Sequence, residues 1–223
     1  MRFLNFLIFA LCAGVGVCAL PGEVLDRGAG AAFYSSDWDD GTAKHTYTNG
    51  PNGLYSVVWS GDKGNFVSGK GYNPGGPRAV DYSGSFEPIG NAYLSLYGWT
   101  TNPLVEYYIV DSYGTHKPCS SLSDNATMLG NVTSDGEVYE IWTKKRINEP
   151  SIQGKATFNQ AFSIRTTKRV GGTITTGNHY AAWKKVGLKL GGYQYMIIAT
   201  EGQNSTGKAT ITVGVAPKDV ATA

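Results

Sequence analysis

Apolar and polar residues alternate along most of this chain, in short runs separated by clusters of Gly, Asn, Pro and Ser. The runs are rich in β-branched and aromatic residues, whose side chains in an extended strand point alternately to the two faces of a sheet. Short strands at this close spacing predict an antiparallel sandwich or jelly roll. The clearest predicted strands are residues 54–59, 92–99, 104–111, 138–144, 157–166, 193–200 and 208–213.

One segment, residues 178–186, breaks the alternation and predicts a single helix. Gly177 or Asn178 can begin this helix, and Gly187 can end it. His179, near its start, has no second histidine nearby to form a metal pair, so we interpret it as structural. The apolar stripe that would dock this helix on the sheet comprises Ala182, Trp183 and Val186.

The composition agrees with a β-rich domain and argues against two classes of binding partner. The chain has 223 residues, which suits one ordinary domain, and it contains 30 Gly, 14 Tyr and only 16% charged residues. A formal net charge of +2 with scattered Lys and Arg favours neither nucleic acid nor an acidic membrane surface as a partner.

The first residues predict export. Residues 1–19 have a positive start, an apolar stretch and small residues before a cut after Ala19, which is typical of a secretory signal peptide. The apolar stretch is short for a membrane anchor. Residues 20–32 are a propeptide or a flexible N-terminus, residues 33–215 form one domain, and residues 216–223 are a short tail. We therefore expect an extracellular protein.

Removal of the signal would leave Cys119 as the only cysteine, which excludes an internal disulfide. A partly buried thiol is the simpler interpretation, and pairing between chains stays open. In a secreted protein, N-glycosylation sequons are possible sites of glycan attachment. Three such sequons begin at Asn125, Asn131 and Asn204.

Glu106 is the one ionisable acid in an otherwise apolar predicted strand, residues 102–110. Alternation puts it on one face with Tyr108 and Val110, and puts Tyr107 on the other. A carboxylate there loses hydration, which is costly unless hydrogen bonds replace the water. Tyr108 is well placed to supply one of these hydrogen bonds.

The second acid, Glu201, ends another aromatic strand, where alternation gives it the same face as Tyr193 and Tyr195. Tyr97 and Trp99 likewise share one face of their strand. The sheet is thus predicted to have a buried aliphatic face and a second face covered with Tyr and Trp. Two isolated carboxylates on an aromatic surface suit a glycosidase, although a sugar-binding sandwich without chemistry has the same composition.

Short motifs over residues 34–213 then point to one family. They are residues 46–50 (TYTNG), 64–71 (GNFVSGKG), 97–99 (YGW), 103–110 (PLVEYYIV), Arg146 with 150–154 (PSIQG), 178–179 (NH) and 199–202 (ATEG). With these motifs in this order, the chain strongly resembles glycoside hydrolase family 11, the compact β-jelly-roll xylanases.

The resemblance implies an all-β jelly roll of two twisted antiparallel sheets forming a cleft, with one α-helix packed on the outside. It implies a secreted, monomeric endo-1,4-β-xylanase that retains anomeric configuration and needs no metal or cofactor. Glu106 would be the nucleophile and Glu201 the general acid/base, with Asn65 beside the acid/base. An amide at that position predicts a mildly acidic to neutral pH optimum.

The resemblance also implies a set of substrate-binding residues. Residues 150–152 look like the tip of the mobile hairpin called the thumb. The full set is Trp38, Tyr97, Trp99, Tyr108, Arg146, Pro150, Ser151, Ile152, Gln160 and Tyr195.

Four positions depart from the usual family pattern: Tyr72, Ala161, Phe162 and Gln203. These departures affect the expected sugar-binding subsites at the edges of the cleft, the product length and the turnover. They do not change the two carboxylates. Two alternatives stay open: a non-catalytic carbohydrate-binding or defence-eliciting protein on the same scaffold, and a β-1,4-glucanase.

Overall fold

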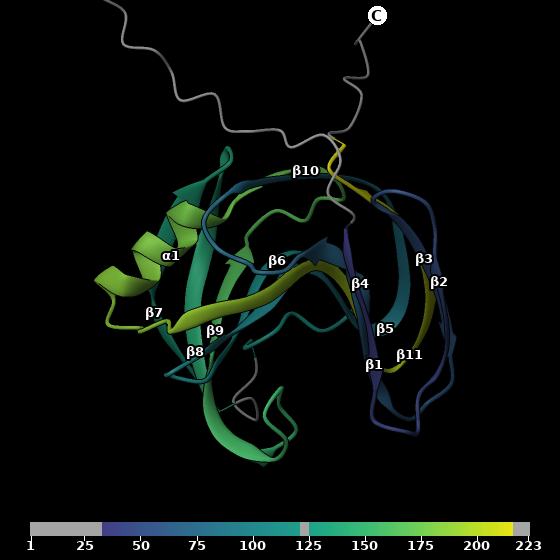
Figure 1. The fold of residues 1–223 in the computed structure, drawn as a ribbon, viewed down its shortest axis with the longest axis horizontal. Coiled ribbons are helices and arrows are strands. Elements are labelled where there is room, and N and C mark those ends of the chain that lie inside the picture. Colours follow the sequence, from purple (N-terminus) through teal and green to yellow (C-terminus); the bar gives the residue numbers. More distant parts are fainter. Residues whose placement is uncertain (1–32, 121–124, 216–223) are drawn as a thin grey trace, which may run out of the picture.

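The computed structural model describes residues 33–120 and 125–215. The predicted signal peptide, the segment 20–32 and the tail 216–223 lie outside these described residues and stay predictions. Within the described part, strands alternate with short turns and there is one helix (Figure 1). The elements are β1 (Tyr34–Asp39), β2 (Lys44–Asn49), β3 (Leu54–Ser60), β4 (Asn65–Tyr72), β5 (Ala79–Thr101), β6 (Val105–Tyr113), β7 (Ala126–Ser134), β8 (Glu137–Glu149), β9 (Ala156–Arg165), β10 (Gly172–Thr175), α1 (Thr176–Lys185) and β11 (Gly192–Val213).

The strands form the predicted jelly roll, and two very long strands connect its layers. β5 has 23 residues and β11 has 22, and they pair with each other along nearly their whole length. The first half of β11 also pairs with β4, and its second half pairs with β3. The two predicted sheets are therefore continuous through β5 and β11, in the order β1-β4-β11-β5-β6-β9-β8-β7. Figure 1 shows the resulting strongly curved sheet.

One pairing differs from the predicted antiparallel pattern. β6 and β9 run parallel, with Glu106 in register with Gln160. The reason is topological: the β7–β8 hairpin lies between β6 and β9 in the chain, so β9 returns to pair beside β6 in the same direction. This parallel pair lies at the centre of the layer that carries Glu106.

Side-chain alternation along the strands separates two apolar clusters. Tyr107 and Ile109 belong to the core between the layers, whereas Tyr108 and Val110 belong to a second cluster on the other face of β6. This confirms the predicted faces of that strand. The description of the inner face as aliphatic is wrong, because its core is also aromatic. Its fully buried rings include Tyr55, Tyr82, Tyr107, Tyr139 and Trp183.

The face predicted for Tyr193 is also wrong. A register shift between Tyr193 and Met196 interrupts the β11–β5 pairing. One extra residue in a strand reverses the face of every residue before it. Tyr193 consequently packs toward the inner core, with its ring 5.2 Å from that of Tyr180, while Tyr195 keeps the face of the second cluster.

The helix α1 begins at Thr176, two residues before the predicted start, and packs on the outside of the sheet (Figure 1). Trp183 anchors it, since its indole is fully buried and donates a 2.9 Å hydrogen bond to Ser163 Oγ. His179 is also fully buried, with its ring edge-on to Tyr139 at 4.7 Å. Burial lowers its pKa to about 4, which suits a neutral packing residue. No helix in the described residues is long and apolar enough to cross a membrane.

A buried charge network holds the segment before β10 against the sheet. Asp111 is 1% exposed, and its carboxylate accepts hydrogen bonds from Tyr82 Oη (2.8 Å), Tyr139 Oη (2.7 Å) and Arg169 Nε (2.7 Å). Arg169 in turn donates to the backbone carbonyl of Thr173 at 2.7 Å. Two tyrosine hydroxyls and the Nε of Arg169 thus converge on one carboxylate, so loss of Asp111 would leave a partly buried cation uncompensated.

We expect Asp111→Ala to lower the free energy of unfolding by about 3–5 kcal/mol, because breaking a buried pair costs far more than breaking an exposed one. Urea unfolding followed by tryptophan fluorescence measures the loss. The control is Glu87→Ala, which removes the exposed 3.2 Å pair with Lys208 and should cost less than about 1 kcal/mol. Equal losses in the two variants would contradict the expectation.

Candidate active site

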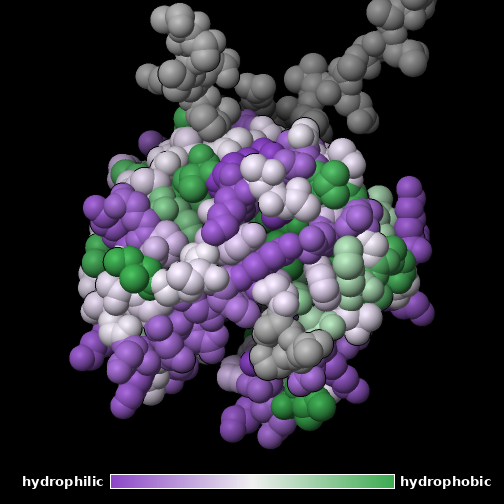
Figure 2. All heavy atoms as spheres, turned by 180° about the vertical axis from the view of Figure 1, so that it is seen from behind, coloured by the Kyte–Doolittle hydropathy of each residue, from purple (hydrophilic) through white to green (hydrophobic). Residues whose placement is uncertain are grey.

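A cavity of about 520 Å³ opens on the face of the sheet that carries the second apolar cluster. The surface is notched at its lower edge in Figure 2, between two groups of mostly hydrophilic side chains. The cavity wall contains every residue predicted for catalysis or substrate binding. These residues are Trp38, Asn65, Tyr97, Trp99, Glu106, Tyr108, Arg146, Pro150, Ser151, Ile152, Gln160, Tyr195 and Glu201.

Glu106 is held by three hydrogen bonds in the middle of this wall. It is 8% exposed; its Oε1 accepts from Tyr97 Oη (2.9 Å) and Tyr108 Oη (3.1 Å), and its Oε2 accepts from Gln160 Nε2 (2.7 Å). Burial raises the pKa of Glu106, and these three donors and the charge of Arg146 oppose the rise. A carboxylate saturated with donors is fixed in place and favoured in its ionised form.

Neighbouring aromatic rings fix the direction of these donors. Trp99 Nε1 donates to Tyr97 Oη at 2.6 Å, so the hydroxyl proton of Tyr97 is left to point at Glu106. Tyr108 stacks on Phe162 with ring centroids 4.7 Å apart and planes within 11°. The predicted hydrogen bond from Tyr108 to Glu106 is confirmed.

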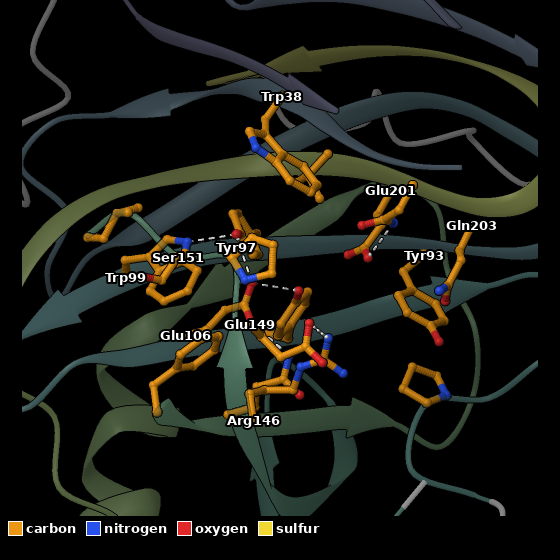
Figure 3. Close-up of a pocket in the computed structure, with 18 of the residues that line it drawn as sticks. Trp38, Tyr93, Tyr97, Trp99, Glu106, Arg146, Glu149, Ser151, Glu201 and Gln203 are labelled. Carbon is orange, nitrogen blue, oxygen red and sulfur yellow. Dashed lines mark hydrogen bonds and ion pairs between the residues drawn. The ribbon is translucent and has the colours of Figure 1, made fainter. Parts of the chain in front are cut away.

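Glu201 enters the same cavity from β11 and has a different environment (Figure 3). Its Oε1 accepts a 3.1 Å hydrogen bond from Asn65 Nδ2, which also donates to the carbonyl of Gly202 at 3.2 Å. Its Oε2 is buried without a hydrogen bond from the described residues. Burial, and then the charge of Glu106, raise the pKa of Glu201 to about 7, against the opposing effect of Asn65.

The two carboxyl groups therefore differ in their hold on a proton. Burial raises the pKa of both groups, but three donors oppose the rise at Glu106, whereas the pKa of Glu201 is about 7 and its Oε2 accepts no hydrogen bond from the described residues. Two acids whose surroundings separate their proton affinities can act as base and acid in one reaction.

A hairpin of β8 and β9 forms one side of the cavity. Arg146 Nη2 lies 3.2 Å from Glu149 Oε2, and the charge of Arg146 lowers the pKa of both Glu106 and Glu201. At the tip, Ser151 Oγ donates to the carbonyl of Gly154 at 2.6 Å, and Gly154 has φ +81°, where a side chain would be strained. The tip is thus a tight turn that presents Ile152, 38% exposed, at the cavity.

Aromatic side chains line the remaining wall. Trp38 on β1 is 42% exposed, although a large apolar ring is ordinarily buried, and Figure 3 shows it across the cavity from Arg146. Tyr195 packs between Tyr34 (ring centroids 5.1 Å apart) and Tyr97 (6.3 Å). An exposed ring next to hydroxyls and carboxylates is a surface on which a sugar ring can stack.

The family model described as glycosyl hydrolases family 11 matches residues 30–212, which is most of the chain. The chain belongs to this family. As a family 11 member it is a glycoside hydrolase, and the cavity described above is its candidate active site. The resemblance drawn from the motifs is thereby confirmed.

Named relatives agree with this assignment. The family 11 chain is 55% identical over 187 residues to Endo-1,4-beta-xylanase 11A of Botryotinia fuckeliana (strain B05.10), which covers 83% of this chain and 81% of the relative. It is 49% identical over 214 residues to an Ethylene-inducing xylanase of Penicillium digitatum (strain Pd1 / CECT 20795). That match covers 93% of this chain and 97% of the relative. A solved structure from a comparison of two major endo-1,4-beta-xylanases of Trichoderma reesei matches with a TM-score of 0.75 at 40% identity, covering 82% of this chain and 99% of the other.

The four departures from the family pattern divide into two kinds. Phe162 and Gln203 line the cavity. Tyr72 and Ala161 belong to the inner core instead, with Tyr72 under the guanidinium of Arg78 at 4.2 Å. Only Phe162 and Gln203 can therefore alter contacts with a bound ligand directly.

Several cavity residues were missed by the sequence analysis. Strand alternation does predict Tyr93 on the face of Tyr97 and Trp99, although Tyr93 is not in the predicted substrate-binding set. Alternation could also have indicated Lys144, two residues before Arg146. No strand period reaches the loop residues Pro118 and Cys119, and Cys119 is buried there. The missed residues are Ser36, Asp37, Asp40, Val67, Tyr93, Pro118, Cys119, Lys144, Glu149 and Phe158.

No group of three or more His, Cys, Asp or Glu suited to a metal ion occurs among residues 33–120 and 125–215.

We expect Asn65→Ala to raise the pKa of Glu201 above its value of about 7, by about one unit, because the ionised carboxylate loses a hydrogen-bond donor. A ¹³C-carboxyl NMR titration measures this pKa directly. The control is Asn91→Ala, whose amide donates to Gln203 Oε1 at 3.3 Å instead of to Glu201. An unchanged or lower pKa in Asn65→Ala would show that this amide does not control Glu201.

Proposed function

We propose that this family 11 enzyme is a secreted endo-1,4-β-xylanase that cleaves internal bonds of xylan and retains the anomeric configuration. The observation that carries the mechanism is the contrast between the two carboxyl groups of the cavity. Glu106, with three donors, is proposed as the nucleophile, and Glu201, with a pKa of about 7, as the general acid/base.

In the first step, ionised Glu106 attacks the anomeric carbon and forms a glycosyl ester. Protonated Glu201 donates its proton to the departing glycosidic oxygen, so the leaving sugar departs as a neutral alcohol. The hydroxyls of Tyr97 and Tyr108 hold Glu106 in one position through this step. Positioning of this kind removes much of the entropic cost of bringing the reacting atoms together.

In the second step, Glu201 acts as the base. Formation of the ester removes the charge of Glu106, which is the second-largest cause of the raised pKa of Glu201. The pKa of Glu201 consequently falls. Glu201 is already ionised at this point, because it gave its proton to the leaving group in the first step. Glu201 then takes a proton from water as the water oxygen attacks the anomeric carbon. The bond between that carbon and Glu106 breaks, Glu106 leaves as the carboxylate, and both acids return to their starting states.

The remaining cavity residues are suited to binding a chain of sugars. We propose that Trp38 stacks on a xylose ring and that Arg146, Gln160 and Tyr195 bind hydroxyls near the reacting sugar. The tip formed by Pro150, Ser151 and Ile152 would close over the substrate. Two carboxyl groups complete the hydrolysis, so the mechanism uses no cofactor.

The secreted location is proposed from the apolar N-terminal residues 1–19. It gives the three glycosylation sequons a function, and the asparagines of all three, Asn125, Asn131 and Asn204, are exposed. We further propose that the enzyme acts as a monomer, because one chain by itself supplies both carboxyl groups and the proposed sugar-binding residues.

Two alternatives from the sequence differ in their support. A β-1,4-glucanase has no support among the relatives reported above, which are named xylanases. The defence-eliciting function is favoured by one observation, the name Ethylene-inducing xylanase of a relative that is 49% identical. That name joins both functions, so we propose ethylene induction as a second function beside catalysis. Ethylene release from leaf tissue treated with a catalytically inactive variant would separate the two.

We expect Glu106→Ala and Glu201→Ala each to lower kcat on xylan by about a thousandfold or more, because each removes a group that reacts with the substrate. Release of reducing sugar from xylan and from soluble cellulose measures activity and specificity. The control Glu87→Ala should retain wild-type activity. Proton NMR of the first products should show the β-anomer. An initial α-anomer, or full activity in either glutamate variant, would overturn the assignment.

The pH profile of kcat/KM should be bell-shaped, with its maximum in the mildly acidic to neutral range. The active form needs Glu201 protonated, so activity falls as the pH rises through its pKa of about 7. It also needs Glu106 ionised, so activity falls at low pH, where that carboxyl takes up a proton. Initial rates on a neutral xylo-oligosaccharide across the pH range test this. A maximum near pH 3 would contradict the contrast between the two acids.

A further inference from the structure

Lys144 lies in the same cross-strand row as Glu106. Glu106 is in register with Gln160 on β9, and Gln160 is in register with Lys144 on β8. Side chains in register across neighbouring strands point to the same face. With strands about 4.8 Å apart, the backbone of Lys144 lies about 10 Å from that of Glu106.

Lys144 belongs to the wall of the active-site cavity, and the residue is half-buried. The next residue, Lys145, is exposed and absent from the cavity wall. Alternation along β8 thus turns one of two adjacent lysines toward the substrate and the other toward solvent.

The other charged groups around the cavity are already paired. Arg146 has Glu149 at 3.2 Å, and Asp37 has His45 at 2.8 Å. Glu140, just outside the wall, has Lys117 at 2.7 Å. Asp40 accepts the backbone N–H of Asn65 at 2.9 Å.

Lys144 differs from all of these groups. Its ammonium group has no ion-pair or hydrogen-bond partner among residues 33–120 and 125–215. A half-buried ammonium loses part of its hydration, and in a cavity wall of lowered dielectric a carboxylate would compensate it better than a neutral hydroxyl.

We propose that Lys144 binds the carboxylate of an acidic sugar branch, so that the enzyme prefers xylan carrying uronic acid substituents to neutral xylan. The inference rests on the proposed xylanase function and names its substrate class. The xylose backbone offers only hydroxyls, which have no net charge to pair with Lys144. A uronic acid attached to a xylose beside the reacting sugar would bring one carboxylate to this wall. There it could pair with the ammonium group of Lys144, which has no partner among the described residues.

The experiment compares two forms of one polymer: a uronic acid-substituted xylan and the same xylan after chemical reduction of its carboxyl groups to alcohols. The readout is the ratio of kcat/KM on the acidic polymer to kcat/KM on the reduced polymer. We expect a ratio of about five in the wild type at low salt, since a partly exposed ion pair has this order of effect, and a decline with added salt.

Three variants locate the effect. Lys144→Gln should bring the ratio close to one, while Lys144→Arg should keep it above one because the charge remains. Lys145→Gln makes the same change in net charge on the opposite face of β8 and should leave the ratio at the wild-type value.

A wild-type ratio of one, or a Lys144→Gln ratio equal to that of the wild type, would overturn the proposal. Equal decreases in Lys144→Gln and Lys145→Gln would also overturn it, because they would indicate general attraction of a polyanion. Failure of the underlying function looks different: a wild-type enzyme that is inactive on both the acidic and the reduced polymer would refute the xylanase assignment, and the proposal with it.

Discussion

The pairing of β5 between β11 and β6 is the constraint on which the active site depends. Glu201 is in register with Tyr93 of β5, and Glu106 is in register with Trp99 of the same strand. The two carboxyl groups therefore belong to strands that are separated by one intervening strand, on one face of one sheet. Backbone hydrogen bonds fix the relative positions of these three strands. The curvature of the sheet brings the remaining walls of the cavity around the two carboxyl groups (Figure 1).

The same face of the sheet supplies the chemical contrast between the acids. Burial removes water from around both carboxyl groups, and exclusion of water makes each remaining hydrogen bond and charge more effective. Tyr97, Tyr108 and Gln160 stabilise the charge of Glu106, while Glu201 has the weaker set of donors and the field of Glu106. One aromatic surface thus serves to bind a sugar and to separate two proton affinities.

Much of this was accessible from strand periodicity. The alternation of Tyr107 and Tyr108 between faces, the isolation of Glu106 and the single helix around Trp183 all follow from local patterns, because burial on one face selects residue types directly. Local patterns failed where one extra residue changed the phase, as at Tyr193, and where a pairing depended on strands distant in the chain, as for the parallel β6–β9 pair.

The sequence by itself determined the fold class, the family and the two candidate acids, because each is encoded in short segments of fixed spacing. Only the tertiary structure decided which side chains meet. It joined the two layers through β5 and β11, turned Lys144 into the cavity and Lys145 away from it, and placed Asn65 against Glu201. These contacts join residues up to 136 positions apart, and no local pattern encodes them, because strand order and register arise from packing of the whole sheet.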